Sequence, residues 1–432
     1  METSNITIEN KIPESTWITK YIFILFGIGS LLAWNAILTE LSFFNQFVGK
    51  LHPFDSLSFL NFAPNIILQF ILLWKKNLFQ IKNQLIFGLI ASIVMLAVIP
   101  TSIILLKNHE NINMVVTIFL MLIMGLINAL MSSGFFTLVS FFPLEMIIAL
   151  STGQGFAGIF LNIIMYILIP TIKYDDDMEK TEIVRSIIFF SVSGFVLLAC
   201  LLILIYSLKT DYFNYHLNEK IRMTKIEEII ADDDQENDNK EHLVKDNDLI
   251  VDLKTSFLGM FKILLDIDLL CVLIYIVTFA TYPCSFEKQH LFHFNEYNLN
   301  TILTIYNCFD TFGRFLVSKV KPTKKLTYIS SLSRTLLIAT IFLNYYFEYK
   351  KDYSLTFTSI MLIFNVSALA ISNGIGTTLC FGIAPTLVTD ELKGQAGASV
   401  SFFLIVGIFI GSSLAFLTKD MLKRIEDPPA IY

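Results

Sequence analysis

Asp310 and Arg314 stand four residues apart within a mostly apolar stretch of the chain, from Leu299 to Val317. On a helix this spacing places both side chains on one face, with their Cβ atoms about 5–6 Å apart. A charge at the centre of a bilayer costs roughly 2.5–3.5 kcal/mol on insertion scales. Two opposite charges one turn apart therefore indicate a pair that faces protein or a water-filled path. Such a pair suits substrate contact or gating, and the alternative is a structural clamp between helices.

Trp34 and Asn35 lie in the middle of another apolar run, although aromatic belts usually place Trp at membrane interfaces. Together they offer a flat wall and a hydrogen-bonding group to a planar polar ligand, and core packing explains them equally well. Most polar side chains inside a membrane simply bond across helices, for about 0.6 kcal/mol each. Arg334 lies near a predicted helix end and is expected to snorkel to the interface. The other polar residues within apolar runs are Asn128, Ser132, Ser133, Asn162, Asn307, Asn365, Ser372 and Asn373.

An enzyme is not indicated. All six histidines map to loops or helix ends, so a Ser–His hydrolase would lack its base. A two-aspartate membrane protease needs a second deep Asp, and Asp266 and Asp268 lie close to the start of a predicted helix. The five cysteines form no CxxC and no Cys/His metal spacing, and no phosphate-binding glycine loop is present. The sequence therefore predicts no catalytic residues, no metal and no cofactor.

The composition and the apolar runs of the chain predict the helices that position these side chains. The chain has 432 residues, of which 54% are hydrophobic and 16% charged, against about 25% charged residues in soluble domains. A spanning helix needs about 20 mostly apolar residues. Eleven such runs are present, at roughly 18–46, 55–74, 84–106, 114–141, 145–172, 183–208, 262–283, 297–318, 325–347, 355–387 and 394–418. This pattern predicts an all-helical polytopic membrane protein that contacts the lipid bilayer.

The charged segments predict the orientation and the division of the chain. The short loops 75–82 and 319–325 are basic and loop 173–182 is acidic, which predicts a cytosolic N-terminus. With an odd number of spans the C-terminus is then expected outside, and we expect the membrane to be the plasma membrane. Residues 209–254 hold 13 acidic and 7 basic residues, and their centre is too polar to order itself. We therefore predict an N-terminal six-helix half (1–208), an acidic cytosolic linker (209–261) and a C-terminal five-helix half (262–432). The rest of the chain has no basic patch for nucleic acid.

A faint internal repeat supports two halves. Pro143 precedes a glycine-rich run that begins at Gly153, and Pro385 precedes one that begins at Gly394. These runs lie at the start of the fifth and the eleventh predicted helices. The two helices occupy equivalent positions in the two halves if the seventh helix corresponds to the first. Many transporters consist of two such repeats with the substrate site between them.

The residues in these positions resemble the equilibrative nucleoside transporter family. Five runs resemble the family pattern, in chain order along almost the whole sequence. The first-helix pattern L-L-P-W-N is matched by Leu31-Leu-Ala-Trp34-Asn35, the fifth-helix pattern S-G-Q-G-x-A-G by Ser151-Thr-Gly-Gln-Gly-Phe-Ala-Gly158, and the eighth-helix pattern N-x-F-D-x-x-G-R by Asn307-Cys-Phe-Asp310-Thr-Phe-Gly-Arg314. The tenth helix of the family resembles Ser372-Asn-Gly374 with Leu379, Cys380 and Pro385, and the eleventh resembles Ala396-Gly-Ala-Ser-Val-Ser-Phe-Phe403 with Gly407 and Gly411.

The resemblance implies a fold like the major facilitator superfamily with one helix missing, in a 6+5 pseudo-two-fold bundle. It implies facilitated, alternating-access passage of purine nucleosides or nucleobases, for example adenosine or adenine. By the family pattern Trp34 and Leu38 line the pocket, and Asp310 and Arg314 contact the ribose hydroxyls. The substrate-binding residues that we predict are Trp34, Leu38, Asn128, Ser132, Asn307, Asp310 and Arg314.

The chain departs from the family pattern at two places. Ala33 replaces the first-helix proline, and Ser132, with Asn128 one turn before it, stands where many members carry a base-reading glutamine. The Phe-, Ile- and Asn-rich composition resembles parasite members such as apicomplexan purine importers. Two other functions stay open. One is a proton-coupled carrier of the same fold that uses Asp310 or Glu40, and the other is a membrane receptor or scaffold that uses the acidic linker.

Overall fold

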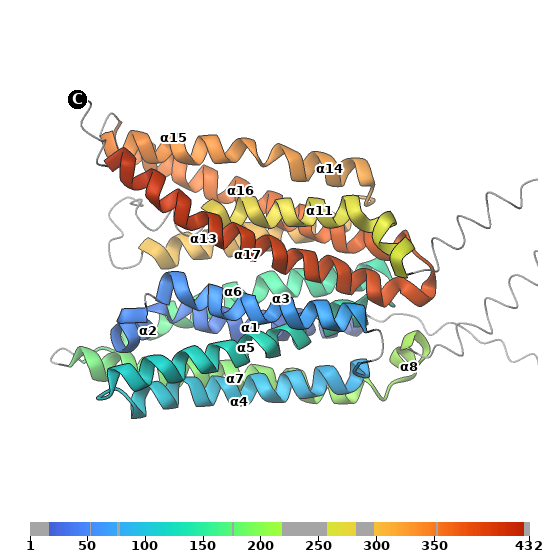
Figure 1. The fold of residues 1–432 in the computed structure, drawn as a ribbon, viewed down its shortest axis with the longest axis horizontal. Coiled ribbons are helices and arrows are strands. Elements are labelled where there is room, and N and C mark those ends of the chain that lie inside the picture. The colour runs from blue at the N-terminus through green and yellow to red at the C-terminus, as the bar shows by residue number, and fades with distance from the viewer. Residues whose placement is uncertain are drawn as a thin grey trace, which may run out of the picture.

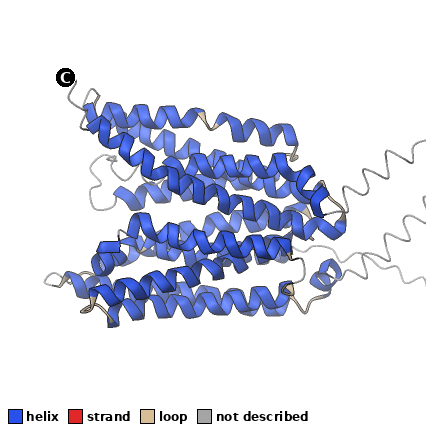
Figure 2. Cartoon of the chain, viewed as in Figure 1, coloured by secondary structure: helices blue, strands red, loops and turns tan. Residues whose placement is uncertain are grey.

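The computed structural model describes residues 17–51, 53–75, 78–174, 177–217, 257–281, 298–350 and 353–426, and the regular structure within these ranges is helical (Figure 2). This confirms the predicted all-helical class. The α-helices are α1 (Trp17–Thr39), α2 (Leu41–Val48), α3 (Pro53–Trp74), α4 (Ile81–Leu105), α5 (Glu110–Val139), α6 (Leu144–Thr171), α7 (Met178–Ser207), α8 (Asp211–Leu217), α11 (Phe257–Thr281), α13 (Asn298–Leu316), α14 (Lys324–Ser333), α15 (Leu336–Lys350), α16 (Leu355–Ile383) and α17 (Lys393–Glu426).

Ten spans in the described part of the chain are long and apolar enough to cross a membrane, where the sequence predicts eleven. α14 and α15 together form one of the ten. The predicted span that is missing from the ten is α13, which has 19 residues but carries Asp310 and Arg314 among several Asn and Thr side chains. The charged pair and its Asn and Thr neighbours together lower the hydropathy of α13.

Three predicted spans differ from the observed helices. The run 18–46 is two helices, because the chain turns at Glu40 between α1 and α2. The run 325–347 is interrupted at Arg334, which is buried instead of snorkelling. α11 begins at Phe257, earlier than predicted, so that Asp268 lies mid-helix and fully buried. Of the predicted linker, α8 and the start of α11 are described, and residues 218–256 lie outside the described residues.

The helices form two groups that lie side by side. Figure 1 shows α1 to α7 in one group and α11 to α17 in the other, with α14 and α15 on the outer side of the second group. We call the end of the bundle that carries Lys75, Lys319 and Lys324 the basic end. It lies on the right in Figure 1, near α8, and the opposite end carries α2 and the start of α13.

Apolar side chains cover the outer surface of the spans as well as filling the core, unlike the pattern in soluble proteins. Large apolar side chains point outward along the spans, among them Phe87, Phe119, Phe195 and Phe364, each more than half exposed. Polar side chains are instead buried between the helices, including many Asn, Ser and Thr residues. Lipid solvates apolar surface and leaves polar groups without partners, so this arrangement is the one expected of a membrane bundle.

The two groups meet closely where α6 crosses α13. A Cβ on Gly155 would lie 2.3 Å from Thr311 Oγ1, and one on Gly158 would lie 2.5 Å from the Asn307 amide carbon. Only glycine allows this approach, and small residues are the usual means by which membrane helices come close. At the basic end the groups are closed by Phe136 of α5 and Phe381 of α16, whose rings stack with centroids 3.5 Å apart.

Candidate functional site

A cavity of about 240 Å³ lies between the two groups of helices. Its lining comes from both groups, chiefly from α1, α3, α5 and α6 on one side and α11, α13 and α17 on the other. Phe136 closes it toward the basic end, and it reaches Thr39 and Ala415 near the opposite end. All seven predicted substrate-binding residues line this one cavity: Trp34, Leu38, Asn128, Ser132, Asn307, Asp310 and Arg314.

Asp310 and Arg314 form a buried ion pair on α13. Arg314 Nε donates to Asp310 Oδ2 over 2.7 Å, and both side chains are less than a tenth exposed. The spacing of four residues places them one turn apart, as the sequence predicts. An isolated charge here would carry a large desolvation cost, which the pairing and the further hydrogen bonds offset.

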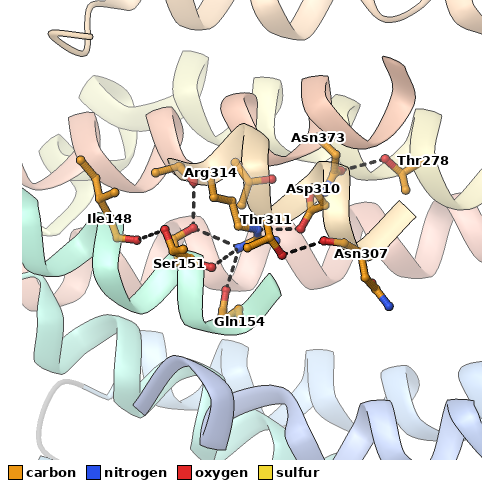
Figure 3. A network of polar contacts seen from close by, with 12 residues as sticks. Ile148, Ser151, Gln154, Thr278, Asn307, Asp310, Thr311, Arg314 and Asn373 are labelled. Atoms are coloured by element: carbon orange, nitrogen blue, oxygen red, sulfur yellow. Dashed lines mark hydrogen bonds and ion pairs between the residues drawn. The ribbon is translucent and has the colours of Figure 1, made fainter. Parts of the chain in front are cut away.

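The rest of the Arg314 guanidinium reaches across to α6 in the other group of helices. Arg314 Nη1 lies 3.0 Å from both the carbonyl oxygen and Oγ of Ser151, and 3.2 Å from Gln154 Oε1 (Figure 3). Ser151 Oγ also bonds Thr378 Oγ1 of α16 over 2.8 Å. Arg314 therefore links the two groups at the cavity wall, and any movement that separates α6 from α13 at this depth must break these bonds.

The second carboxylate oxygen of Asp310 is held from α16. Asn373 Nδ2 donates to Asp310 Oδ1 over 2.8 Å, and Gly374 makes room, since a Cβ there would lie 2.1 Å from the Asp310 carbonyl oxygen. Asn373 Oδ1 in turn accepts from Arg334 Nη1 over 3.3 Å, and Thr278 Oγ1 of α11 lies 2.9 Å from it. Arg334 therefore holds Asn373, which in turn holds Asp310. The prediction that Arg334 snorkels to the interface is wrong, because the side chain is buried here.

The pair keeps capacity for a ligand. An ionised carboxylate offers about four acceptor sites, and Arg314 and Asn373 occupy two of them on Asp310. The pair borders the cavity, so vicinal hydroxyl groups entering it could donate to the carboxylate. Guanidinium N–H groups could donate to an ether or hydroxyl oxygen. This is the chemistry of sugar recognition.

Aromatic and neutral polar groups line the rest of the cavity. The rings of Trp34 and Phe62 meet edge to face, with centroids 5.2 Å apart and planes at 68°. Of the described lining residues, Asp310 and Arg314 are the charged ones. The neutral polar lining is dominated by carboxamides, namely Asn35, Asn61, Asn65, Asn128, Gln154, Asn162, Asn307 and Asn373. Such a lining suits an uncharged ligand that carries both donors and acceptors.

Sequence reasoning missed the contribution of α3. Asn61 and Asn65 line the cavity, and Gln69 follows on the same face, where it donates to Asn65 Oδ1 over 2.8 Å. The signal was present, because amides at positions i, i+4 and i+8 form a polar stripe along an otherwise apolar helix. Within the described residues no group of three or more His, Cys, Asp or Glu side chains could hold a metal ion.

Comparison with known sequences gives a consistent result. A family model described as nucleoside transporter matches residues 115–420. Equilibrative nucleotide transporter 7 of Arabidopsis thaliana is 24% identical over 415 residues, which cover 93% of this chain and 94% of the relative. Equilibrative nucleoside transporter 1 of Homo sapiens is 20% identical over 454 residues, which cover 93% and 96%.

Solved structures resemble the fold at much lower sequence identity. The proton:xylose symporter of the major facilitator superfamily, bound to 6-bromo-6-deoxy-D-glucose, has a TM-score of 0.61 at 13% identity and covers 94% of this chain and 89% of its own. A bacterial homologue of the iron transporter ferroportin has a TM-score of 0.59 at 10% identity and covers 94% and 95%. The fold therefore resembles that of the major facilitator superfamily, as predicted.

Proposed function

The chain belongs to the nucleoside transporter family, and we propose that it carries purine nucleosides or nucleobases passively across a membrane by alternating access. Membership confirms the family resemblance seen in the sequence, and it confirms that the protein is a transporter and not an enzyme. We further propose that α13 is an eleventh span and that residues 1–208 and 262–432 are the two moving halves, joined by a cytosolic linker. In this arrangement the basic end faces the cytosol, the C-terminus lies outside, and the membrane is the plasma membrane.

The observation that carries the proposal is the placement of Asp310 and Arg314 at the boundary between the two groups of helices. The pair lines the cavity, and Arg314 also bonds Ser151 and Gln154 of the other group. A ligand that bonds Asp310 and Arg314 therefore acts on the same groups that join the halves. This supports coupling between substrate binding and the relative movement of the halves, which alternating access requires.

The state of the two ends also supports alternating access. Between Phe136 and the basic end the two groups of helices are in tight contact. A Cβ on Gly397 of α17 would lie 2.0 Å from Ser140 Oγ and 2.5 Å from the Phe136 carbonyl oxygen. The cavity extends instead toward Thr39 and Ala415. We infer that the structure represents the half of the cycle in which substrate enters from the opposite end. Tight glycine contacts at the basic end would separate in the other half.

A second candidate is a proton-coupled carrier, and buried Glu40 favours it. Glu40 is 1% exposed, Ser186 Oγ donates to its Oε2 over 2.6 Å, and its Oε1 has no hydrogen-bond partner among the described residues. Burial disfavours the charged form of this carboxyl group, whereas Ser186 and the nearby Arg185 favour it, so that proton uptake and release there could accompany transport.

Uptake of labelled adenosine, inosine, adenine and uridine into liposomes that hold the purified protein tests both candidates. The proposal predicts saturable uptake of at least one purine that stops when the inner and outer concentrations are equal, with or without a proton gradient. Accumulation above the outer concentration under an inward proton gradient, lost in Glu40→Gln, would establish the second candidate instead. The passive proposal fails if no purine or pyrimidine enters faster than into protein-free liposomes.

A further inference from the structure

The charged pair on α13 has a neutral counterpart on α3. Gln69 Nε2 donates to Asn65 Oδ1 over 2.8 Å, just as Arg314 Nε donates to Asp310 Oδ2 over 2.7 Å, and in each pair the two residues lie one helical turn apart. The same interval of 245 residues separates Asn65 from Asp310 and Gln69 from Arg314. α3 therefore carries, in uncharged form, the arrangement that α13 carries with two charges.

The correspondence between the two groups of helices extends beyond these pairs. The interval of 245 residues also separates Asn128 of α5 from Asn373 of α16, and Phe136 of α5 from Phe381 of α16. The rings of Phe136 and Phe381 stack face to face, with planes at 6°. Two equivalent residues that touch each other lie at the pseudo-two-fold axis between the halves. The α3 pair and the α13 pair therefore lie on opposite sides of the stacked rings, because this axis exchanges them.

Both pairs also bond across to the other group of helices. Arg314 reaches Ser151 and Gln154 of α6. On the other side of the axis, Ser401 Oγ of α17 donates to Gln69 Oε1 over 3.2 Å. α17 corresponds to α6 in the predicted repeat, and α3 packs against α17 as α13 packs against α6. Gln69 and Ser401 are each 1% exposed, and Gln69 is not among the described residues that line the cavity. The Gln69 side chain therefore joins the two groups and does not face the ligand.

The bond between Gln69 and Ser401 lies toward the closed end of the cavity. Gln69 is in the last two turns of α3, which ends at Trp74 beside the basic end. Opening of the basic end requires α3 and α17 to separate there, so this bond belongs to the state that is closed at that end.

We propose that Gln69 is a positioning residue for transport, which holds α3 to α17 through Ser401 and so keeps the basic end closed. We call Asn65, Gln69 and Ser401 the neutral junction, the counterpart of the charged junction that Arg314 makes with α6. This assignment rests on the proposed alternating access. Since Gln69 does not face the ligand, the neutral junction sets how often the empty carrier opens at the basic end.

Amide hydrogen exchange of the full-length protein in liposomes, measured by mass spectrometry without substrate, tests this assignment. Gln69→Leu keeps the side-chain volume and removes the bond between the halves, which should raise the population open at the basic end about fivefold. Amides of α5 and α17 at that end, in residues 134–142 and 393–400, should then exchange faster by about the same factor. Amides of α6 and α13 at the opposite end should exchange more slowly, because that end closes when the basic end opens. Ser401→Ala is a milder change and should shift both ends in the same directions.

Two comparisons separate a junction between the halves from general loosening of the fold. In the double variant the shift should equal that of Gln69→Leu alone, because both changes remove the same bond between α3 and α17. Gln84→Leu is the matched control, since Gln84 of α4 is buried and donates to the Leu130 carbonyl oxygen of α5 within one group. Exchange at the basic end should be unchanged in Gln84→Leu.

Four outcomes would overturn the assignment: no shift in either Gln69→Leu or Ser401→Ala, faster exchange at both ends together, additive shifts in the double variant, or an equal shift in Gln84→Leu. The measurement needs no substrate. A wild-type protein that moves no purine or pyrimidine would therefore overturn the proposed function separately from this result.

Discussion

The wall of the cavity formed by α13 and α16 carries two charges, whereas the wall formed by α3 and α5 carries none. On the charged wall, Asp310 and Arg314 each bond protein partners from two directions. On the neutral wall, Asn128 of α5 donates to Asn61 of α3, and the Asn61 amide group has no hydrogen-bond partner among the described residues. The charged wall is held in one arrangement by its neighbours, while the neutral wall can exchange donor and acceptor by rotating two amides.

Because of this difference, one cavity can be selective for one part of a ligand and tolerant of changes in another part. A charged group that is fixed by its protein partners binds one geometry of ligand hydroxyl groups best, because those partners cannot turn without breaking their other hydrogen bonds. Amides that can rotate accept either order of donor and acceptor on a ring. We therefore expect changes at the charged wall to abolish transport, and changes at the neutral wall to alter which base is preferred.

Loss of either member of the charged pair should have the largest effect. Arg314→Ala leaves the Asp310 carboxylate buried without its cation, and breaking a buried pair costs roughly 3–5 kcal/mol. Asp310→Asn can place an NH₂ group against Arg314 or Asn373, both of which donate to this side chain. We expect transport per protein in liposomes to fall about 100-fold or more in each variant.

Arg314→Lys is the matched variant for this prediction, because it keeps the charge and loses the planar fork that holds Asp310, Ser151 and Gln154 together. Its transport should fall between those of the wild-type protein and Arg314→Ala. Normal transport by both Arg314→Ala and Asp310→Asn would show that the pair is only a structural clamp, and that the difference between the walls has no functional meaning.

The charged wall could be predicted from the sequence more fully than the neutral one. A lone Asp and Arg in an apolar run are conspicuous, and their spacing alone gives the i,i+4 ion pair that the structure contains. Asn373 was recognised as an intramembrane polar residue, but its bond to Asp310 joins residues 63 apart in the chain, which only tertiary packing decides. Arg334 was misplaced because burial by α11 and α16 cannot be read from its local sequence.

Asn61 escaped prediction for a different physical reason. A single amide in an apolar helix is common and usually bonds a neighbouring helix, so its type does not distinguish a ligand contact from a structural one. The contacts that Asn61 makes depend on how Gly125 of α5 meets α3. The all-helical class was predicted correctly because hydrophobic runs and their lengths determine it, whereas the helix breaks at Glu40 and Arg334 leave no signal in that pattern.

A change where the two groups of helices are joined should have the next largest effect. In Gly155→Ala the new Cβ would lie 2.3 Å from Thr311 Oγ1 and 3.0 Å from its Cα, so α6 and α13 must separate. Overpacking of this kind costs about 1–3 kcal/mol, and we expect transport to fall about tenfold. Gly194→Ala is the control, because nothing lies within 4 Å of a Cβ at that position on α7. Equal transport by both alanine variants would show that the tight contact between α6 and α13 does not matter for transport.

Ser151→Ala should have the smallest effect, and this effect should be on the KM for uptake and not on kcat. The variant loses the Ser151 Oγ contacts to Arg314 and Thr378, but Arg314 keeps its bonds to the Ser151 carbonyl oxygen and to Gln154. The lost contacts join the two groups in the state closed at the basic end. Their loss lowers the population of that state, and the apparent affinity for a ligand entering from the opposite end falls in proportion.

We therefore expect the KM for uptake from that end to rise about threefold, as fits the loss of a hydrogen bond with a net value of about 0.5–1.5 kcal/mol, while kcat does not fall. Ser193→Ala provides the control, since that buried serine of α7 donates to the Phe189 carbonyl oxygen of its own helix. A fall in kcat at unchanged KM would mean that Ser151 acts on the movement of the loaded carrier. In that case the charged wall would govern the rate of alternation as well as the recognition of the ligand.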